Sequence, residues 1–142
     1  MTLADIRIGL RAYLLADSTI STRVGGNRIY PVKLPQGITA DSIVYTKISG
    51  QGDHHMQGPS GLTRPRIQID SWSQSMDAAS SLADLVKERI DGFEGLMPWG
   101  ENSPAEAIVV KGIFFESERE GWDEGAKLYR VSRDYLVWYA ER

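Results

Sequence analysis

Hydrophobic residues recur at helical spacing in two stretches of the chain, which predicts two amphipathic helices. The first stretch covers Thr2–Ala16, and Asp17 or Ser18 can cap a further short helical turn that ends before Gly25. The second begins after Ser75, a favourable N-cap residue, and runs to about Ile90. Its apolar stripe consists of Ala79, Leu82, Ala83, Val86 and Ile90.

Short runs of β-branched and aromatic residues between glycine and proline positions predict strands. The predicted strands are Arg28–Pro31, Ser42–Ile48, Pro65–Trp72, Ala107–Phe115 and Leu128–Tyr139. Leu128–Tyr139 has the clearest alternation, and Arg133 is the exception on its apolar face. Ala107–Phe115 is apolar on both faces, as in a buried strand, and Gly112 is a candidate bulge position.

Three segments are predicted to lack regular secondary structure. Ser49–Arg64 is polar and rich in glycine, which predicts a long exposed loop or the tip of a flexible hairpin. Gly95–Pro104 is another irregular segment, and Glu116–Gly125 reads as an acidic loop.

The predicted element order is α-β-β-β-α-β-β, without a repeated strand–helix–strand rhythm. This order favours an α+β fold with a mainly antiparallel sheet and two helices packed on one face. The length of 142 residues fits a single domain spanning residues 1–142.

The amino-acid composition limits which kinds of catalytic or metal-binding site the chain can form. The chain has 42% hydrophobic and 25% charged residues, typical of a globular domain, and contains no cysteine. Disulfide scaffolds, cysteine zinc sites, iron–sulfur clusters and thiol nucleophiles are therefore excluded. The longest apolar runs are too short for a membrane span, and we expect no signal peptide.

Charge is distributed unevenly along the chain. The net charge of −3 argues against a protein dedicated to binding phosphate backbones. Residues 1–75 hold eight basic and five acidic side chains (net +3), whereas residues 76–142 hold eight and fourteen (net −6). Two halves with different surfaces would favour orderly self-association, although a chance drift in surface charge explains the numbers equally well.

Candidate catalytic and metal-binding groups are few. Asp53, His54 and His55 form the one cluster that suggests a metal, but adjacent residues of an extended backbone point to opposite sides. The carboxylates of the acidic segment offer a second candidate site, although such a segment is more typical of a solvated loop. We therefore expect no catalytic, metal or cofactor site.

The four tryptophans divide into two pairs. Trp72 and Trp138 fall on predicted strands, where we expect the helices to cover them. Trp99 and Trp122 fall in the irregular segments, where exposed aromatic side chains often anchor a partner protein.

Several strings of residues together resemble a known family. They include Gln68–Ser73 (QIDSWS), the strand SIVYTKISG that starts at Ser42, and the closing Leu128–Arg130 followed by Asp134–Tyr139 (DYLVWY). This order, over almost the whole chain, resembles the tail terminator family of long-tailed bacteriophages and gene transfer agents, also called tail completion or head-tail joining proteins. The resemblance implies an antiparallel sheet with helices against it, and a structural protein without enzymatic activity.

The resemblance also implies a place and partners. Such a protein forms a homo-oligomeric ring, typically a hexamer, on the head-proximal end of the tail tube, where it ends tube polymerisation and docks the head-tail connector protein. It would be assembled in the host cytoplasm and reside in the virion, with DNA passing through its channel without specific binding, and with no membrane or cofactor. From length and polarity of the segments, the interface candidates are Gln51, Asp53, His54, His55, Met56, Trp99, Glu116, Glu118, Glu120 and Trp122.

Three alternatives stay open at this point. Within the same class, the chain fits another neck component, such as a head-closure or connector protein. A small metal-dependent hydrolase would use Asp53, His54 and the acidic segment. A single-stranded nucleic-acid binder would use a surface formed by Arg64, Arg66, Trp72 and Trp138.

Overall fold

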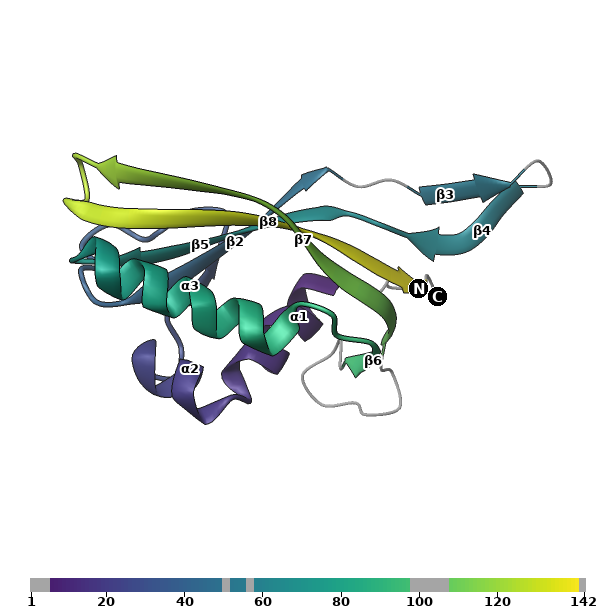
Figure 1. The fold of residues 1–142 in the computed structure, drawn as a ribbon, viewed down its shortest axis with the longest axis horizontal. Helices are drawn as coiled ribbons and strands as arrows, with labels where there is room; N and C mark the ends of the chain where they lie inside the picture. The colour runs from purple at the N-terminus through teal and green to yellow at the C-terminus, as the bar shows by residue number, and fades with distance from the viewer. Residues whose placement is uncertain (1–5, 50–51, 56–57, 98–107, 141–142) are drawn as a thin grey trace.

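The computed structural model describes residues 6–49, 52–55, 58–97 and 108–140. In this part of the chain three helices lie on one side of a β-sheet (Figure 1). They are α1 (Ile6–Leu15), α2 (Ser18–Arg23) and α3 (Met76–Ile90). The prediction of two helices was thus one short, because the turn capped by Asp17 is a helix of its own.

Side-chain caps fix where the helices begin. Asp17 Oδ1 accepts hydrogen bonds from the backbone N–H groups of Thr19 at 2.9 Å and Ile20 at 3.2 Å. Ser75 Oγ accepts from the Ala78 N–H at 3.1 Å. Both caps satisfy N–H groups that have no partner inside the helix, and each contributes about 1 kcal/mol. The predicted stripe of α3 is buried as expected.

The sheet is mixed. Its strands are β1 (Ile29–Pro31), β2 (Ser42–Ser49), β3 (Gly52–His55), β4 (Gly58–Thr63), β5 (Arg66–Ser73), β6 (Gly95–Met97), β7 (Ile108–Asp123) and β8 (Leu128–Ala140). β1, β2, β5 and β8 follow one another across the sheet, and β7 and then β6 continue it beyond β8. β1 pairs with β2 in parallel, and the pairs β2–β5, β5–β8, β7–β8 and β6–β7 are antiparallel. The α+β class holds, but the predicted order lacked α2, the β3–β4 hairpin and β6.

Two predicted loops are strands. Ser49–Arg64 contains the hairpin β3–β4, whose second strand continues onto β8 at Leu62↔Ala140, so the hairpin alternative was right and the loop alternative wrong. The prediction of an acidic loop over Glu116–Gly125 was wrong, because β7 continues to Asp123 and stays in register with β8 up to the pair Asp123↔Leu128. The predicted bulge next to Gly112 is present, and a second bulge interrupts β7 between Phe115 and Ser117.

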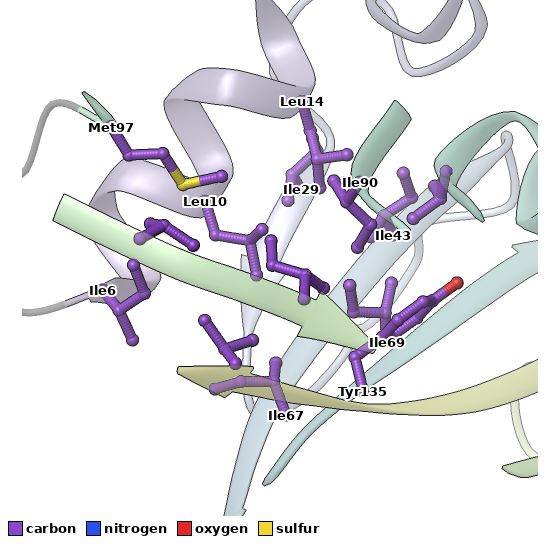
Figure 2. Packing of buried hydrophobic residues seen from close by; sticks show 14 of the residues in the cluster. Ile6, Leu10, Leu14, Ile29, Ile43, Ile67, Ile69, Ile90, Met97 and Tyr135 are labelled. Atoms are coloured by element: carbon purple, nitrogen blue, oxygen red, sulfur yellow. The ribbon is translucent and has the colours of Figure 1, made fainter. Parts of the chain in front are cut away.

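The main core lies between the helices and the sheet (Figure 2). Leu10 and Leu14 of α1 face Ile67 and Ile69 of β5, and Tyr135 of β8 is the largest fully buried side chain. Full burial of one leucine or isoleucine side chain stabilises the fold by about 1.5–3 kcal/mol. This core holds the helices to one face of the sheet, and no described helix lies on the opposite face.

Trp72 and Trp138 are not covered by the helices, contrary to the prediction. Neighbouring strand residues point to opposite faces, and Val137 and Tyr139 belong to the main core, so Trp138 points to the other side. Trp72 packs there in a second, smaller cluster with Val44 and Leu128. It is only 8% exposed because side chains of the 32–39 segment and the Arg130 guanidinium lie over it.

Candidate protein interface

The face of the sheet opposite the helices is the first candidate surface (Figure 1). We call it the uncovered face and define it by the side chains of β5, β7 and β8 that point away from α3. They include Arg66, Gln68, Asp70, Ser117, Arg119, Arg130 and Asp134. Charged residues thus replace the apolar ones found on the helix side.

Asp134 is the centre of an ion-pair network on the uncovered face. Its side chain is only 10% exposed and lies 3.2 Å from Arg119 Nη2 and 3.7 Å from Arg66 Nη1. Ser117 Oγ donates to it at 3.2 Å. The hydrogen bond to Asp134 and the charge of Asp134 raise the pKa of Arg119, so the guanidinium stays protonated. The network ties β5, β7 and β8 together with side chains.

Arginines and tryptophans meet on this face. The Arg64 guanidinium lies 5.1 Å from the Trp138 ring, and that of Arg130 lies 5.6 Å from the Trp72 ring. The residues of the nucleic-acid alternative are therefore partly brought together. Asp134 pairs with Arg66 and Arg119, however, which reduces the net positive charge that such binding requires.

A groove of about 690 Å³ opens at one end of the uncovered face. Its walls are the 32–39 segment, Val44, Trp72, Arg130 and the turn that follows Asp123. Trp72 Nε1 and Arg130 Nε are buried and have no hydrogen-bond partner among the described residues. A wall that mixes apolar and charged side chains is typical of a surface that contacts protein.

Exposed apolar side chains lie on β6 and on the first half of β7. Leu96 and Val109 are directly opposite in the register, and Leu96 is 66% exposed. Phe114 is 50% exposed, and its ring lies over Gly112, where an added Cβ would come within 2.7 Å of Phe114 Cζ. The pattern of the sequence does not reveal this patch, because Gly95–Pro104 is predicted to be irregular and the strand β6 lies within it. Apolar side chains clustered in this way mark contact surfaces.

The glutamates of β7 do not converge. Glu116 lies on the uncovered face, 3.5 Å from Arg66, whereas Glu118 lies on the helix side and accepts a hydrogen bond from Arg133. Glu120 is exposed. Glu116 and Glu118, on opposite faces of the strand, cannot act together on one substrate bond. Glu120 shares the helix side with Glu118, whose carboxylate is held by Arg133.

Trp122 lies near the end of β7 and is 48% exposed. Its ring packs on Tyr129 with the ring centroids 4.7 Å apart, and its indole N–H donates to Glu124 Oε2 at 2.8 Å. The side chain is therefore held in one orientation while half of it stays accessible, as in an interface anchor.

The other interface candidates lie at the far hairpin or outside the described residues. Asp53, His54 and His55 form part of β3, in the hairpin that projects from the body of the molecule (Figure 1). Gln51, Met56 and Trp99 lie outside the described residues. The partner role of all these candidates stays a prediction.

The hydrolase residues are far apart. β4 joins β8 at Ala140, whereas Glu118 pairs with Arg133, seven residues earlier on β8. At about 3.3 Å per residue, roughly 23 Å of strand separates the hairpin from Glu118. Among the described residues no group of three or more histidine or acidic side chains is placed to hold a metal ion. None of the described helices has the length and apolar character needed to span a membrane.

The chain is similar to known proteins in sequence and in fold. The family model described as "Tail completion protein gp17" matches residues 9–140. A chain of a solved structure titled "Virion of native gene transfer agent (GTA) particle" has a similar fold, with a TM-score of 0.71 and 14% sequence identity over 94% of this chain and 92% of that chain. The search of curated proteins gave no match. The chain therefore belongs to the family of tail completion protein gp17, whose members have a structural role in the phage tail.

Proposed function

We propose that this protein forms a ring, typically of six copies, on the head-proximal end of a tail tube. There it stops the addition of further tube subunits and offers the surface on which the head-tail connector protein docks. Its partners are further copies of itself, the tail tube protein and the connector. The match of residues 9–140 to the tail completion family is the observation that carries this proposal.

The surfaces of the fold support an assembly role. The uncovered face, the patch formed by Leu96, Val109 and Phe114, and the projecting β3–β4 hairpin all lie outside the core that stabilises the monomer. A ring subunit needs such surfaces because it contacts neighbours on two sides as well as the tube and the connector. We assign the uncovered face and its groove to contact with the tube or the connector. We assign the β3–β4 hairpin and β7 to contacts with other protein subunits.

DNA passes through the channel of the proposed ring without specific binding. The net charge is −3, and Arg66 and Arg119 of the uncovered face lie beside carboxylates. Such a surface has little attraction for phosphate groups. The virion neck is the proposed location, with assembly in the host cytoplasm.

Deletion of the gene from the virus or transfer agent that encodes it tests the proposal. Electron microscopy should then show filled heads without tails and free tails of irregular, excessive length. Complementation with the wild-type gene should restore joined particles of uniform tail length. Free tails of normal, uniform length would instead assign the chain to head closure, and normal particles would contradict any neck role.

A further inference from the structure

The outer edge of β7 is open over half of the strand. β6 pairs with β7 only at Ile108–Val110. Further along, the Ile113 carbonyl accepts from the Gly92 N–H at 2.7 Å, and the Phe115 N–H donates to Asp91 Oδ1 at 3.0 Å. From residue 116 to residue 122, no described residue bonds this edge.

The orientation of the free backbone groups follows from the side chains. Ile113 and Phe115 point to the helix side of the sheet and direct their backbone groups away from β8. Glu120, opposite Val131 of the helix-side core, lies on that same side. Along a strand, residues whose side chains lie on the same face direct their N–H and C=O groups to the same edge. The N–H and C=O of Glu120 therefore also point away from β8.

The opposite edge of the sheet is closed along β1. The Ile29 carbonyl of β1 accepts from Arg11 Nε at 3.0 Å, and the Ile29 N–H donates to the Asn27 carbonyl at 2.8 Å. Pro31 has no N–H, and its carbonyl accepts from the Lys33 N–H at 2.7 Å. A further strand cannot add to β1, so two copies cannot join β7 to β1 through backbone hydrogen bonds.

β3 is a second strand with an open edge. Within the described part of the chain it pairs with β4 alone, and its hairpin projects from the body (Figure 1). β6 also has an open side, but it is only three residues long. β3 is antiparallel to β4, β4 to β8, and β8 to β7, so β3 and β7 run in opposite directions. A second copy displaced along the molecule can place its β3 antiparallel to β7.

We propose that β3 of one copy adds to the open edge of β7 in the next copy. This inference rests on the proposed ring. Each copy then donates one edge and accepts one, a head-to-tail contact that closes into a ring and leaves neither edge exposed. Pairing of β7 with a second β7 is disfavoured, because it sets Glu118 and Glu120 beside the same residues of the partner.

Thiol cross-linking tests the contact without background, since the chain has no cysteine. The double variant Glu120→Cys with His54→Cys, treated at high concentration or in particles with a short bis-maleimide, should give a ladder of dimers, trimers and larger species. Either single variant should stop at dimers. The matched control, His54→Cys with the exposed α3 position Glu88→Cys, should give no ladder. No ladder from the first pair, or an equal one from the control, would overturn the inference.

A proline variant separates the edge from the fold. Glu120→Pro removes an N–H that points away from β8, so the β7–β8 ladder and the thermal unfolding temperature should be preserved. Ring formation, measured by electron microscopy of particle necks, should fall at least tenfold, whereas Glu120→Gln, which keeps the N–H, should reduce it far less. Normal rings from a folded Glu120→Pro protein would refute the strand addition while leaving the proposed function intact. Normal particles after deletion of the gene would instead refute the proposed function.

Discussion

Arg133 on β8 donates from Nη2 to Asp84 Oδ1 on α3 at 2.9 Å, so one side chain ties the sheet to the helix above it. Arg133 Nε also donates to Glu118 on β7. Burial lowers the pKa of Arg133, but the hydrogen bonds to Glu118 and Asp84 more than offset this and leave the pKa raised. The residue that interrupts the apolar face of β8 in the sequence is therefore a charged tie between three elements.

Replacement of Arg133 by methionine should lower the free energy of unfolding by about 2 kcal/mol, because two ion-pair contacts are lost and two carboxylates keep no partner there. Methionine retains much of the aliphatic volume, so the effect reports mainly the lost charge. Urea denaturation measures it, with Lys111→Met at an exposed position as the control. Equal midpoints for the two variants would contradict the role of Arg133.

Asp41 should couple α2 to β5. Its Oδ2 lies 2.9 Å from Arg23 Nε, and its Oδ1 accepts from Ser73 Oγ at 2.7 Å. We expect Asp41→Ala to lower the free energy of unfolding by about 2 kcal/mol, and Ser73→Ala by about 1 kcal/mol. A double-mutant cycle of Arg23→Ala and Asp41→Ala should give a coupling energy of about 1 kcal/mol. Strict additivity would show that the pair contributes nothing.

Tyr135 should make the fold sensitive to alkali. Burial raises the pKa of its hydroxyl well above the ordinary value, and the nearby Arg133 charge lowers it only in part, without a hydrogen bond of normal geometry. The unfolded chain releases this proton at about pH 10, but the folded chain keeps it. The buried hydroxyl therefore contributes its full stabilisation of the fold below that pH, and this stabilisation is lost as the pH rises above it. This one group can lower the free energy of unfolding by at most about 1.4 kcal/mol per pH unit.

Tyr135→Phe checks this expectation. The free energy of unfolding, measured by urea denaturation between about pH 8 and pH 11, should fall less steeply for the variant than for the wild type. Tyr30→Phe, at a partly exposed position, serves as the control and should follow the wild type. Parallel curves for Tyr135→Phe and the wild type would show that this hydroxyl is not the source.

Shortening the β3–β4 hairpin should separate assembly from folding. Its described pairing with the body is limited to Leu62↔Ala140 and Thr63↔Tyr139. Deletion of residues 51–57 should therefore change the free energy of unfolding by less than about 1 kcal/mol. The yield of infectious or transducing particles should fall strongly, and an unaltered yield from a stable variant would remove the hairpin from the interface.

Much of the fold is predictable because local patterns agree with the tertiary structure. The stripe of α3, the Ser75 cap and the alternation of β8 each specify their element without outside help. The second half of β7 could not be predicted, because it carries charges on both faces and no apolar side. Those charges are matched by Arg66 on one face and Arg133 on the other, which becomes apparent only once the register with β8 is known.

The candidate interface was predictable only in part. Trp122 is exposed as expected, since it follows polar residues near a turn. The Asp134 network was not predicted, because the bulge between Phe115 and Ser117 decides which β7 side chains reach the uncovered face. The open edge of β7 is a property of strand order, which the local sequence does not encode.

Electron cryomicroscopy of the neck in intact particles tests the central claim most directly. We predict a closed ring of this chain between the last ring of the tail tube and the head connector, with β3 of each copy lying along β7 of the next. Its absence from the neck, or its presence there as separate copies without mutual contact, would contradict the account.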